Sequence, residues 1–189
     1  MPRFKLVVIG DGAVGKTALC MTFASNEFPE EHIPTVFEQH VRDIDFENKT
    51  YELEIFDTAG QEDLGRIRSL SYNGANALIV CYSVDLMSSF HDVKENWIKE
   101  GRHYCPKAPI ILVALKSDLR KDQEAIDKLT KANQSFVTIE QGKKLSEEIQ
   151  AYSFHECSAK LKENIDDVFI DALKASKENI KKESGCIIL

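Results

Sequence analysis

A glycine-rich segment near the start of the chain ends in a lysine and a threonine. The segment GDGAVGKT (10–17) fits the pattern G-x-x-x-x-G-K-[ST], and it follows an apolar run and precedes a helix-like stretch. In this pattern the glycines let backbone N–H groups turn toward phosphate oxygens, and the start of the helix adds positive potential. Lys16 would reach the β- and γ-phosphates, and Thr17 would offer its hydroxyl to Mg²⁺. The pattern predicts a phosphate-binding loop rather than a plain glycine turn.

A second polar cluster, IFDTAGQE (55–62), comes directly after another apolar run. A site that hydrolyses a nucleotide needs a carboxylate near the metal and a group that orients water. Asp57 would serve the magnesium shell, the Gly60 N–H would face the γ-phosphate, and Gln61 would orient the attacking water. A DTAG turn on its own could equally be structural, but behind a phosphate loop the functional interpretation is favoured.

Short apolar runs that alternate with helical patterns supply the elements that must position these groups. Most of the runs are continuous rather than alternating, which is typical of strands covered on both faces. The predicted strands are 4–10, 51–57, 77–83, 109–115 and 153–157. On either side of ENKT (47–50) the apolar residues recur at a spacing of two, which predicts an antiparallel hairpin at one edge of the sheet.

Helical patterns fill the stretches between the strands. Thr138 with Gln141 forms a capping-box pattern, and 121–134 is predicted to be a short exposed helix. The last helix, with Asn164 as its cap, places these apolar residues on one face: Ile165, Val168, Phe169, Ala172 and Leu173. From Lys174 onward the pattern frays. The expected fold class is α/β, with a six-stranded, mostly parallel sheet, one antiparallel edge strand and helices on both faces.

The composition bounds the organisation and the class of partner. The 189 residues fit one domain, predicted as 1–176, with a flexible tail at 177–189. A net charge of −7 argues against nucleic acid as a partner. The five cysteines show no CxxC pair and no metal spacing, which favours reduced thiols in the cytosol. No run suits a signal peptide or a membrane span, so we expect membrane contact only through a lipid or a partner.

Taken together, these motifs resemble the Ras superfamily of small GTPases and, more closely, its Rho family. The resemblance runs nearly end to end and implies a P-loop G domain. The segments that carry it are GDGAVGKT, FPEEHIPTVFE (28–38), DTAGQED (57–63), RSLSY (68–72), LKSDLR (115–120), ECSAK (156–160) and CIIL (186–189). PTVFE and the extra helix at 121–134 point to Rho rather than to Ras or Rab, and they do not separate the Rho, Rac and Cdc-type branches.

The resemblance implies a site for GTP or GDP with Mg²⁺. Thr35 would coordinate the ion and sense the γ-phosphate, and Phe28 would pack across the guanine. Asp118 would accept the two donors on the guanine edge, Lys116 would lay its stem on the base, and the Ala159 N–H would meet O6. The implied nucleotide contacts are Gly12, Ala13, Val14, Gly15, Lys16, Thr17, Ala18, Phe28, Thr35, Asp57, Gly60, Lys116, Asp118, Leu119, Ser158, Ala159 and Lys160. The implied catalytic residues are Gln61, Lys16, Gly60 and Thr35, and the implied metal ligands are Thr17, Thr35 and Asp57.

Leu115 departs from the base-reading motif of the family, [NT]-K-x-D. Leucine cannot make the polar contact that asparagine or threonine makes there, and one lost hydrogen bond costs about 0.5–1.5 kcal/mol. We therefore expect somewhat weaker binding and faster nucleotide exchange, with the preference for guanine intact.

The segment from Ala18 to Val41, which includes Thr35, contains no arginine or lysine and so supplies no arginine finger of its own. Intrinsic hydrolysis should therefore be slow, on the order of 10⁻⁴ s⁻¹ as in Ras-type sites without a partner, and a GTPase-activating protein would supply an arginine in trans. Since Gly12 and Gln61 are both present, the chain is expected to be competent in hydrolysis. The γ-phosphate and Mg²⁺ would hold the loops around Thr35 and Gly60, and hydrolysis would release them. The resemblance implies a monomeric switch that signals to the actin cytoskeleton.

The sequence says less about binding partners than about the nucleotide site. Effectors are expected to bind around 26–40 and 60–72. His32 stands where the family usually has tyrosine, either as a solvated loop residue or as a group that titrates near neutral pH and tunes partner binding. LGRIR (64–68) replaces the usual Tyr-Asp at its first two positions, and Phe56 stands where some branches carry tryptophan, so the guanine nucleotide exchange factor stays open.

The carboxyl end, CIIL, is a C-a-a-X signal whose final leucine favours geranylgeranyl on Cys186. The lysines upstream are offset by glutamates, and the tail has no second cysteine for palmitate. One lipid with a weak basic patch gives reversible attachment. The resemblance implies cycling between the cytosol and the cytoplasmic face of the plasma membrane, with a dissociation-inhibitor carrier that shields the lipid.

Two other classes of function compete with this one. An interaction module could hold nucleotide without turning it over, but Gly12, Thr35 and Gln61 speak against it. A P-loop metabolic kinase or ATPase should show a substrate lid with clustered arginines and no guanine-reading motif, and neither feature is visible. Comparing GTP with ATP binding would discriminate best among these classes.

Overall fold

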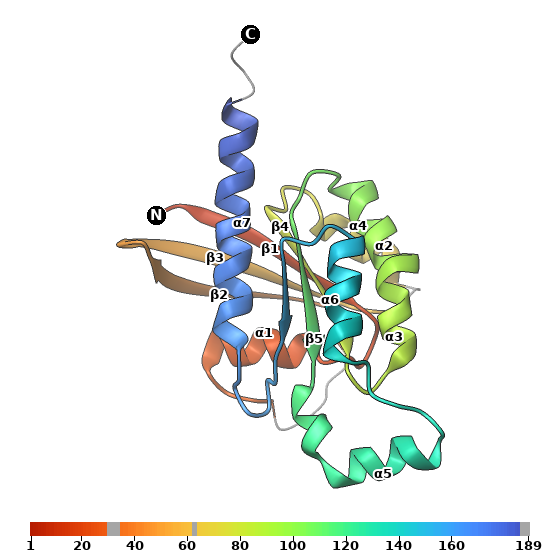
Figure 1. The fold of residues 1–189 in the computed structure, drawn as a ribbon. Coiled ribbons are helices and arrows are strands. Elements are labelled where there is room, and N and C mark those ends of the chain that lie inside the picture. The colour runs from red at the N-terminus through yellow and green to blue at the C-terminus, as the bar shows by residue number, and fades with distance from the viewer. Residues whose placement is uncertain (30–34, 62–63, 186–189) are drawn as a thin grey trace.

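The structure is a computed structural model that describes residues 1–29, 35–61 and 64–185. Its centre is a six-stranded sheet in the order β2-β3-β1-β4-β5-β6 (Figure 1). The strands are β1 (Arg3–Gly10), β2 (Phe37–Phe46), β3 (Lys49–Thr58), β4 (Ala77–Ser83), β5 (Ile110–Leu115) and β6 (Ser153–Glu156). The β2–β3 pair is antiparallel and the other neighbours are parallel. The predicted α/β fold class and all five predicted strands are confirmed.

Helices cover both faces of the sheet. They are α1 (Lys16–Ser25), α2 (Gly65–Ser71), α3 (Met87–Asp92), the π-helical segment η2 (Val93–Trp97), α4 (Ile98–Tyr104), the 3₁₀ turn η3 (Ser117–Lys121), α5 (Gln123–Lys131), α6 (Ile139–Glu148) and α7 (Ile165–Gly185). The core has two layers, because alternate residues of β1 face opposite sides of the sheet. Leu6 and Val8 pack with α1 and α7, whereas Val7 and Ile9 pack with the α3–α4 region and α6. Burial on both faces explains the continuous apolar runs.

The hairpin between β2 and β3 turns through Glu47 and Asn48. Both residues have positive φ, 51° and 59°, as a two-residue type I′ turn requires. The register pairs Phe46 with Lys49 at the turn and Phe37 with Thr58 at the far end. The hairpin predicted around ENKT is therefore confirmed, and it carries β2 to the edge of the sheet.

Local capping chemistry explains where two of the helices begin. Thr138 accepts from the Gln141 N–H and Gln141 accepts from the Thr138 N–H, which confirms the predicted capping box of α6. The predicted short helix at 121–134 is present as α5, which begins later because Asp122 caps it through the Ala125 N–H. In Figure 1 α5 projects away from the sheet, as its polar composition predicts.

The last helix differs from its prediction at both ends. Asn164 precedes α7, but its φ of 58° is left-handed, unlike the extended backbone of an ordinary N-cap, and its side-chain amide donates to the Glu156 carbonyl. Beyond the predicted boundary at residue 176, α7 continues as a helix to Gly185 and extends past the sheet (Figure 1). Lys177 donates to Glu47 at 2.6 Å, so the residues after 176 still contact the β2–β3 hairpin.

The stretch from Met87 to Tyr104 is one continuous helix with a π-helical turn in its middle. Its first half is anchored at the end of β4, where the Ser89 hydroxyl accepts from the Ser83 N–H at 3.1 Å. Its second half contributes Trp97, which is buried, and Gly101, where a Cβ would lie 2.8 Å from Leu78 Cδ1. Close packing of this helix on the sheet places its second half next to the functional site.

Among the described helices, none combines the length and the apolar character that a transmembrane span needs.

Candidate nucleotide-binding site

The phosphate loop runs from the end of β1 into α1. Gly10 and Gly15 have φ of 145° and 108°, and a Cβ on Gly10 would lie 2.3 Å from the Cys81 carbonyl oxygen, so only glycine fits there. Lys16 is 5% exposed, and its Nζ donates to the carbonyls of Gly10 and Asp11 at 2.8 and 2.7 Å. Burial lowers the pKa of Lys16, and the nearby Asp57 carboxylate offsets part of that effect. The backbone carbonyls of the loop thus hold the Lys16 ammonium group within the loop.

Three oxygen-bearing side chains meet beside the loop. The Thr17 hydroxyl donates to Asp57 Oδ2 at 2.6 Å and lies 2.6 Å from the Thr35 hydroxyl. Asp57 is fully buried, and its Oδ1 has no hydrogen-bond partner within the part of the chain that the structure describes. Burial raises the pKa of Asp57, while the Thr17 hydrogen bond and the Lys16 charge act in the opposite direction. This set of hydroxyl and carboxylate oxygens fits a hard divalent cation such as Mg²⁺.

The segment that follows β3 lies directly against the phosphate loop. A Cβ on Gly60 would lie 2.2 Å from the Gly12 N and 2.3 Å from the Asp11 carbonyl carbon, so a side chain at 60 would force the two segments apart. At Gly12 a Cβ would have no neighbour within 4 Å among the described residues, which leaves open space over the loop. Gln61 is exposed beside that space.

Arg68 of α2 anchors the backbone around Gly60. Its Nη1 donates to the carbonyls of Ala59 and Gln61 at 2.7 and 3.2 Å, although only 5% of Arg68 is exposed. Its Nε and Nη2 donate to the two oxygens of Glu100 at 2.6 and 2.9 Å. The Tyr72 hydroxyl also donates to Glu100, at 2.6 Å. A bidentate charged pair in a partly buried setting fixes both geometry and register.

Trp97 ends η2, which continues into α4, the helix that carries Glu100. It connects this helix to the phosphate loop. The Trp97 Nε1–H donates to Asp11 Oδ1 at 2.6 Å, and the Arg68 guanidinium lies 4.7 Å from the centre of the Trp97 ring. With Glu100 three residues on, one helical face contacts both the phosphate loop and α2. Neither connection was predicted from the sequence, because Asp11 and Trp97 are 86 residues apart and no local pattern marks the pair.

The predicted base-reading residues lie together at the ends of β5 and β6. Asp118 Oδ1 accepts from the Ser158 hydroxyl at 2.6 Å, and Lys116 Nζ donates to the Ala13 carbonyl at 2.8 Å. The backbone of Lys116 is left-handed, with φ of 62°, which turns the chain out of the strand. Ala159 is buried next to Ser158. Segments far apart in sequence therefore converge where parallel strands end, the usual ligand position in open α/β sheets.

The other predicted contacts lie around this centre. Leu119 is half-buried against the core layer on the α6 side of the sheet, whereas Lys160 is exposed. Phe28 is 42% exposed. Leu115 is 2% exposed and belongs to the core layer with α1, and its Cδ1 lies 3.8 Å from the position that a Cβ on Gly15 would take. Its side chain therefore packs beneath the phosphate loop.

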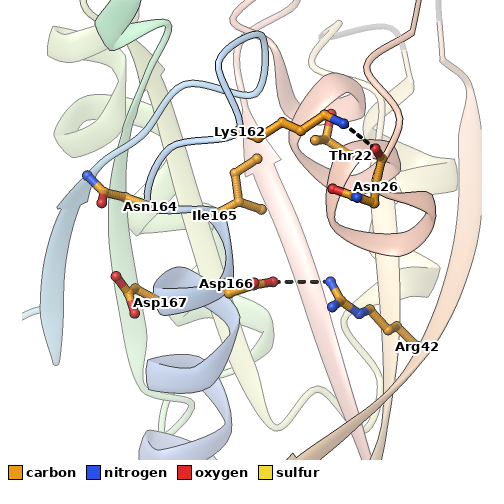
Figure 2. Close-up of a pocket in the computed structure, with 8 residues that line it drawn as sticks. All are labelled: Thr22, Asn26, Arg42, Lys162, Asn164, Ile165, Asp166 and Asp167. Carbon is orange, nitrogen blue, oxygen red and sulfur yellow. Dashed lines mark hydrogen bonds and ion pairs between the residues drawn. The ribbon is translucent and has the colours of Figure 1, made fainter.

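A surface pocket beside α1, shown in Figure 2, contains the contacts that hold the 158–165 loop in place. Lys162 Nζ donates to the Asn26 carbonyl at 2.6 Å, and Arg42 bonds to Asp166 at 3.1 Å (Figure 2). Arg42 also donates to the Phe23 carbonyl at 2.6 Å. These contacts join the end of α1, strand β2 and the start of α7, and so they position the loop that carries Ser158 and Ala159.

Some predictions fall outside the described residues. His32 and the terminal segment 186–189, with Cys186, are among them, as are the residues at 62 and 63. Within the described part, Glu38 and His40 lie close to Asp57, a cluster that the sequence motifs did not reveal. Their spacing of two on a strand was a usable signal, since it places both side chains on one face.

Comparisons with known proteins agree with this geometry. A family model described as "Ras family" matches residues 5–178. The Rho-related GTP-binding protein RhoB of Homo sapiens is 46% identical over 186 residues, which cover 98% of this chain and 95% of that protein. The GTP-binding proteins rho5 and rho1 of Schizosaccharomyces pombe are each 44% identical, over 99% of this chain and 98% of each relative.

The fold and the phosphate loop define a P-loop nucleotide-binding protein with a G domain. The chain belongs to the Rho family of small GTPases, so it is a switch that binds GTP and hydrolyses it to GDP and phosphate.

Proposed function

We propose that this GTPase recruits effectors in its GTP-bound form and is attached to membranes by a lipid on Cys186. The observation that supports the switching mechanism is the cluster of Thr17, Thr35 and Asp57, in which the Thr17 hydroxyl lies 2.6 Å from both the Thr35 hydroxyl and Asp57 Oδ2. Thr35 belongs to the segment that precedes β2, and Asp57 belongs to β3. A ligand that engages this cluster therefore controls the position of the segment before β2.

The phosphate end of the site holds and orients the nucleotide. Lys16 and the N–H groups of residues 12–18 bind the phosphates, and Thr17, Thr35 and Asp57 hold Mg²⁺. Mg²⁺, when bound, neutralises the charge that develops on the transferring phosphoryl group. The Gly60 N–H faces the γ-phosphate, and Gln61 orients the attacking water in the open space beside Gly12. An activating protein brings an arginine to the same space, and the exposed position of Gln61 leaves room for it.

The base end of the site selects guanine. Asp118, held by the Ser158 hydroxyl, accepts from the two donors on the guanine edge, while Lys116 and Phe28 cover the faces of the base. Ala159 offers its N–H to O6, and Leu119 and Lys160 complete the surroundings. Adenine presents no such pair of donors, so it leaves the Asp118 carboxylate without these two hydrogen bonds.

Competition between GTP and ATP tests this assignment most directly. GTP should displace a fluorescent guanine nucleotide from the purified chain, and ATP should not. Asp118→Asn should shift the preference toward xanthosine nucleotides, because the amide N–H₂ can donate to the second carbonyl of xanthine. An unchanged preference in Asp118→Asn would contradict the role of this residue, even if GTP binding itself is normal.

Single-turnover phosphate release tests the catalytic assignment. The rate should be low for the chain alone, should rise on addition of a Rho-type activating protein, and should fall in Gln61→Leu, which retains bound GTP. Equal rates for the chain and for Gln61→Leu would remove Gln61 from catalysis.

Membrane attachment is tested at the carboxyl end. We expect geranylgeranyl on Cys186 and reversible association with the cytoplasmic face of the plasma membrane, assisted by a dissociation-inhibitor carrier. Effectors contact residues around 26–40 and 60–72, and the pathway leads to the actin cytoskeleton. Cys186→Ser should abolish recovery with membranes and leave nucleotide binding unaltered, and membrane association that persists in this variant would refute the anchor.

A further inference from the structure

Three side chains of metal-ligand type meet on one face of the β2–β3 hairpin. Glu38 and His40 are two residues apart on β2, so their side chains leave the same face of the strand. Asp57 is the cross-strand partner of Glu38 in the antiparallel register, and it faces the same way. One possible ligand atom from each of these residues lies within 4.8 Å of the other two.

Two of the three side chains each carry a buried atom that has no hydrogen bond to any described residue. Asp57 is fully buried, and among the described residues its Oδ1 has no hydrogen-bond partner. His40 Nε2 is likewise buried without a hydrogen bond to any described residue, at 3.5 Å from Glu38 Oε2. Leaving buried polar atoms unsatisfied costs free energy that a bound ion would recover.

The third group provides access. The side chain of Glu38 is 49% exposed, against 17% for His40. The cluster is therefore open to solvent on the Glu38 side and closed on the Asp57 side, an arrangement that allows an ion to enter and then to be enclosed.

We propose that Glu38, His40 and Asp57 form a binding site for a transition-metal ion of the Zn²⁺ class, separate from the Mg²⁺ site. One imidazole and two carboxylates are a ligand set that Zn²⁺ accepts, with the fourth position left for water. Tetrahedral ligands at 2.0–2.2 Å from zinc lie roughly 3.4 Å apart, so the three side chains need only small rotations to close on an ion.

Asp57 would serve both sites through different oxygens. Its Oδ2 accepts from Thr17 on the Mg²⁺ side, and its Oδ1 is free to bind elsewhere. The imidazole distinguishes the two sites, because Mg²⁺ prefers oxygen ligands whereas Zn²⁺ binds imidazole well. Excess Mg²⁺ should therefore fill its own site without blocking the second one.

An ion at this position would fix the start of β2 against β3. Val36 and Phe37, which precede the cluster directly, are 55% and 41% exposed. If effectors bind this region, a consequence that rests on the proposed function, the ion would hold the apolar contact residues in one arrangement. Metal binding itself does not depend on effector recruitment or on hydrolysis.

Titration of the full-length, GDP-loaded chain with metal in excess Mg²⁺ tests the proposal. Zn²⁺ should bind with one equivalent by calorimetry, and Co²⁺ should give visible absorption of tetrahedral intensity that Zn²⁺ removes. His40→Asn should weaken Zn²⁺ binding at least about tenfold, since even the loss of a supporting group costs 10- to 100-fold in metal sites. Glu38→Gln should weaken it too, and His91→Asn, which alters an exposed histidine on α3, should not.

The alternative outcomes are distinct. Zn²⁺ affinity that is unchanged in both His40→Asn and Glu38→Gln would overturn the proposal, as would Co²⁺ absorption with thiolate charge-transfer bands that survives in His40→Asn. Absence of any Zn²⁺ binding by the GDP-loaded chain would overturn it as well. Bound GDP, measured by chromatography in every sample, shows independently whether a variant is folded and whether the nucleotide assignment holds.

Discussion

Leu115 illustrates how one residue can belong to both the core and the site. It is the last residue of β5, it is almost fully buried, and its Cδ1 reaches toward Gly15 of the phosphate loop. The apolar contact supports the loop from below, where the related motif places a polar group. The faster exchange expected from the sequence stays a prediction, and the structure adds that Leu115 also contributes to core packing.

Leu115→Thr should slow GDP dissociation by about two- to tenfold, the effect of one hydrogen bond. It should also lower the free energy of unfolding by about 0.5–3 kcal/mol, because a buried apolar side chain is shortened. Stopped-flow release of a fluorescent GDP analogue and urea unfolding measure the two effects.

Leu112→Thr provides the matched control. Leu112 is fully buried on the same strand but faces the other core layer. This control should lose similar stability without slower GDP release. Equal release rates in wild type and Leu115→Thr would exclude the polar-contact explanation.

The described cysteines should be chemically inert in the folded chain. Cys20, Cys81, Cys105 and Cys157 are free and buried. Burial raises the pKa of the Cys157 thiol to about 12, so almost no reactive thiolate forms near neutral pH. In a Cys186→Ser background, Ellman's reagent at about pH 8 should label these four thiols slowly in the native chain and quickly in urea. Rapid labelling of the native chain would contradict the buried positions.

Individual site residues could be predicted from the sequence where adjacent residues form a recognisable motif. The phosphate loop and the LKSDLR segment each place a motif on a few adjacent residues, and the structure brings both to one edge of the sheet. Arg68, Trp97 and Glu100 act through contacts between distant segments, so no local spacing reveals them. Glu38 and His40 carried a usable strand-face pattern, but it becomes meaningful only once Asp57 lies opposite.

At the scale of elements, the continuous helix formed by η2 and α4 holds α2 and the phosphate loop in fixed relation. Glu100 receives two hydrogen bonds from Arg68, and Arg68 in turn holds the carbonyls of Ala59 and Gln61. Arg68 is therefore a positioning residue for Gln61 rather than a catalytic one.

Arg68→Gln should lower the rate of GTP hydrolysis in single turnover with little change in GTP affinity, because the backbone that carries Gln61 loses its support. The free energy of unfolding should fall by about 1.5–3 kcal/mol, as for other charge-assisted hydrogen bonds. Arg66→Gln, an exposed neighbour on α2, is the matched control and should match wild type in both measurements. Normal hydrolysis in Arg68→Gln would show that Gln61 is positioned without it.

The same contact predicts a pH dependence of stability. Burial alone would raise the pKa of Glu100, but the hydrogen bonds from Arg68 and Tyr72 outweigh it and the pKa is lowered. A lowered pKa in the folded state stabilises the fold above the unfolded value of about 4.3, and this stabilisation is lost as pH falls through the folded value. In urea unfolding, the gap between wild type and Glu100→Gln should be largest near neutral pH and should shrink below about pH 4. A gap that is constant with pH would contradict the lowered pKa.

Element boundaries were predictable where capping chemistry is local. The α6 capping box and the Glu47–Asn48 turn are set by adjacent residues, so both appeared where expected. The end of α7 was predicted too early, because its polar residues lack a core-facing pattern in sequence. In the structure Lys177 is supported by Glu47 and lies 4.8 Å from the centre of the Phe46 ring, contacts that only the folded hairpin provides.

For the whole molecule, these contacts bear on where the domain ends. Truncation after residue 176 removes Lys177 from the hairpin, and it also removes Glu178, which accepts from the Tyr152 hydroxyl at 2.9 Å. We expect the 1–176 chain to fold and bind GDP, with a melting temperature lower by about 2–4 °C, the size expected in a chain of this length when a few surface contacts are lost.

The 1–185 chain is the control for that truncation. It keeps both contacts and should melt with the full-length protein in calorimetry. Identical melting of the 1–176 chain and the 1–185 chain would place the structural end of the domain at 176.

The π-helical turn at Val93–Trp97 sets how the two halves of its helix face relative to each other. Each residue of an α-helix turns the chain by about 100°, and a π-helical turn holds one residue more than an α-helical turn. If the same sequence formed a regular α-helix, Ser89 would still meet Ser83, but Trp97 and Glu100 would be rotated by about 100° and would face away from Asp11 and Arg68. The wide turn thus lets one helix contact the end of β4 with its first half and both the phosphate loop and α2 with its second half.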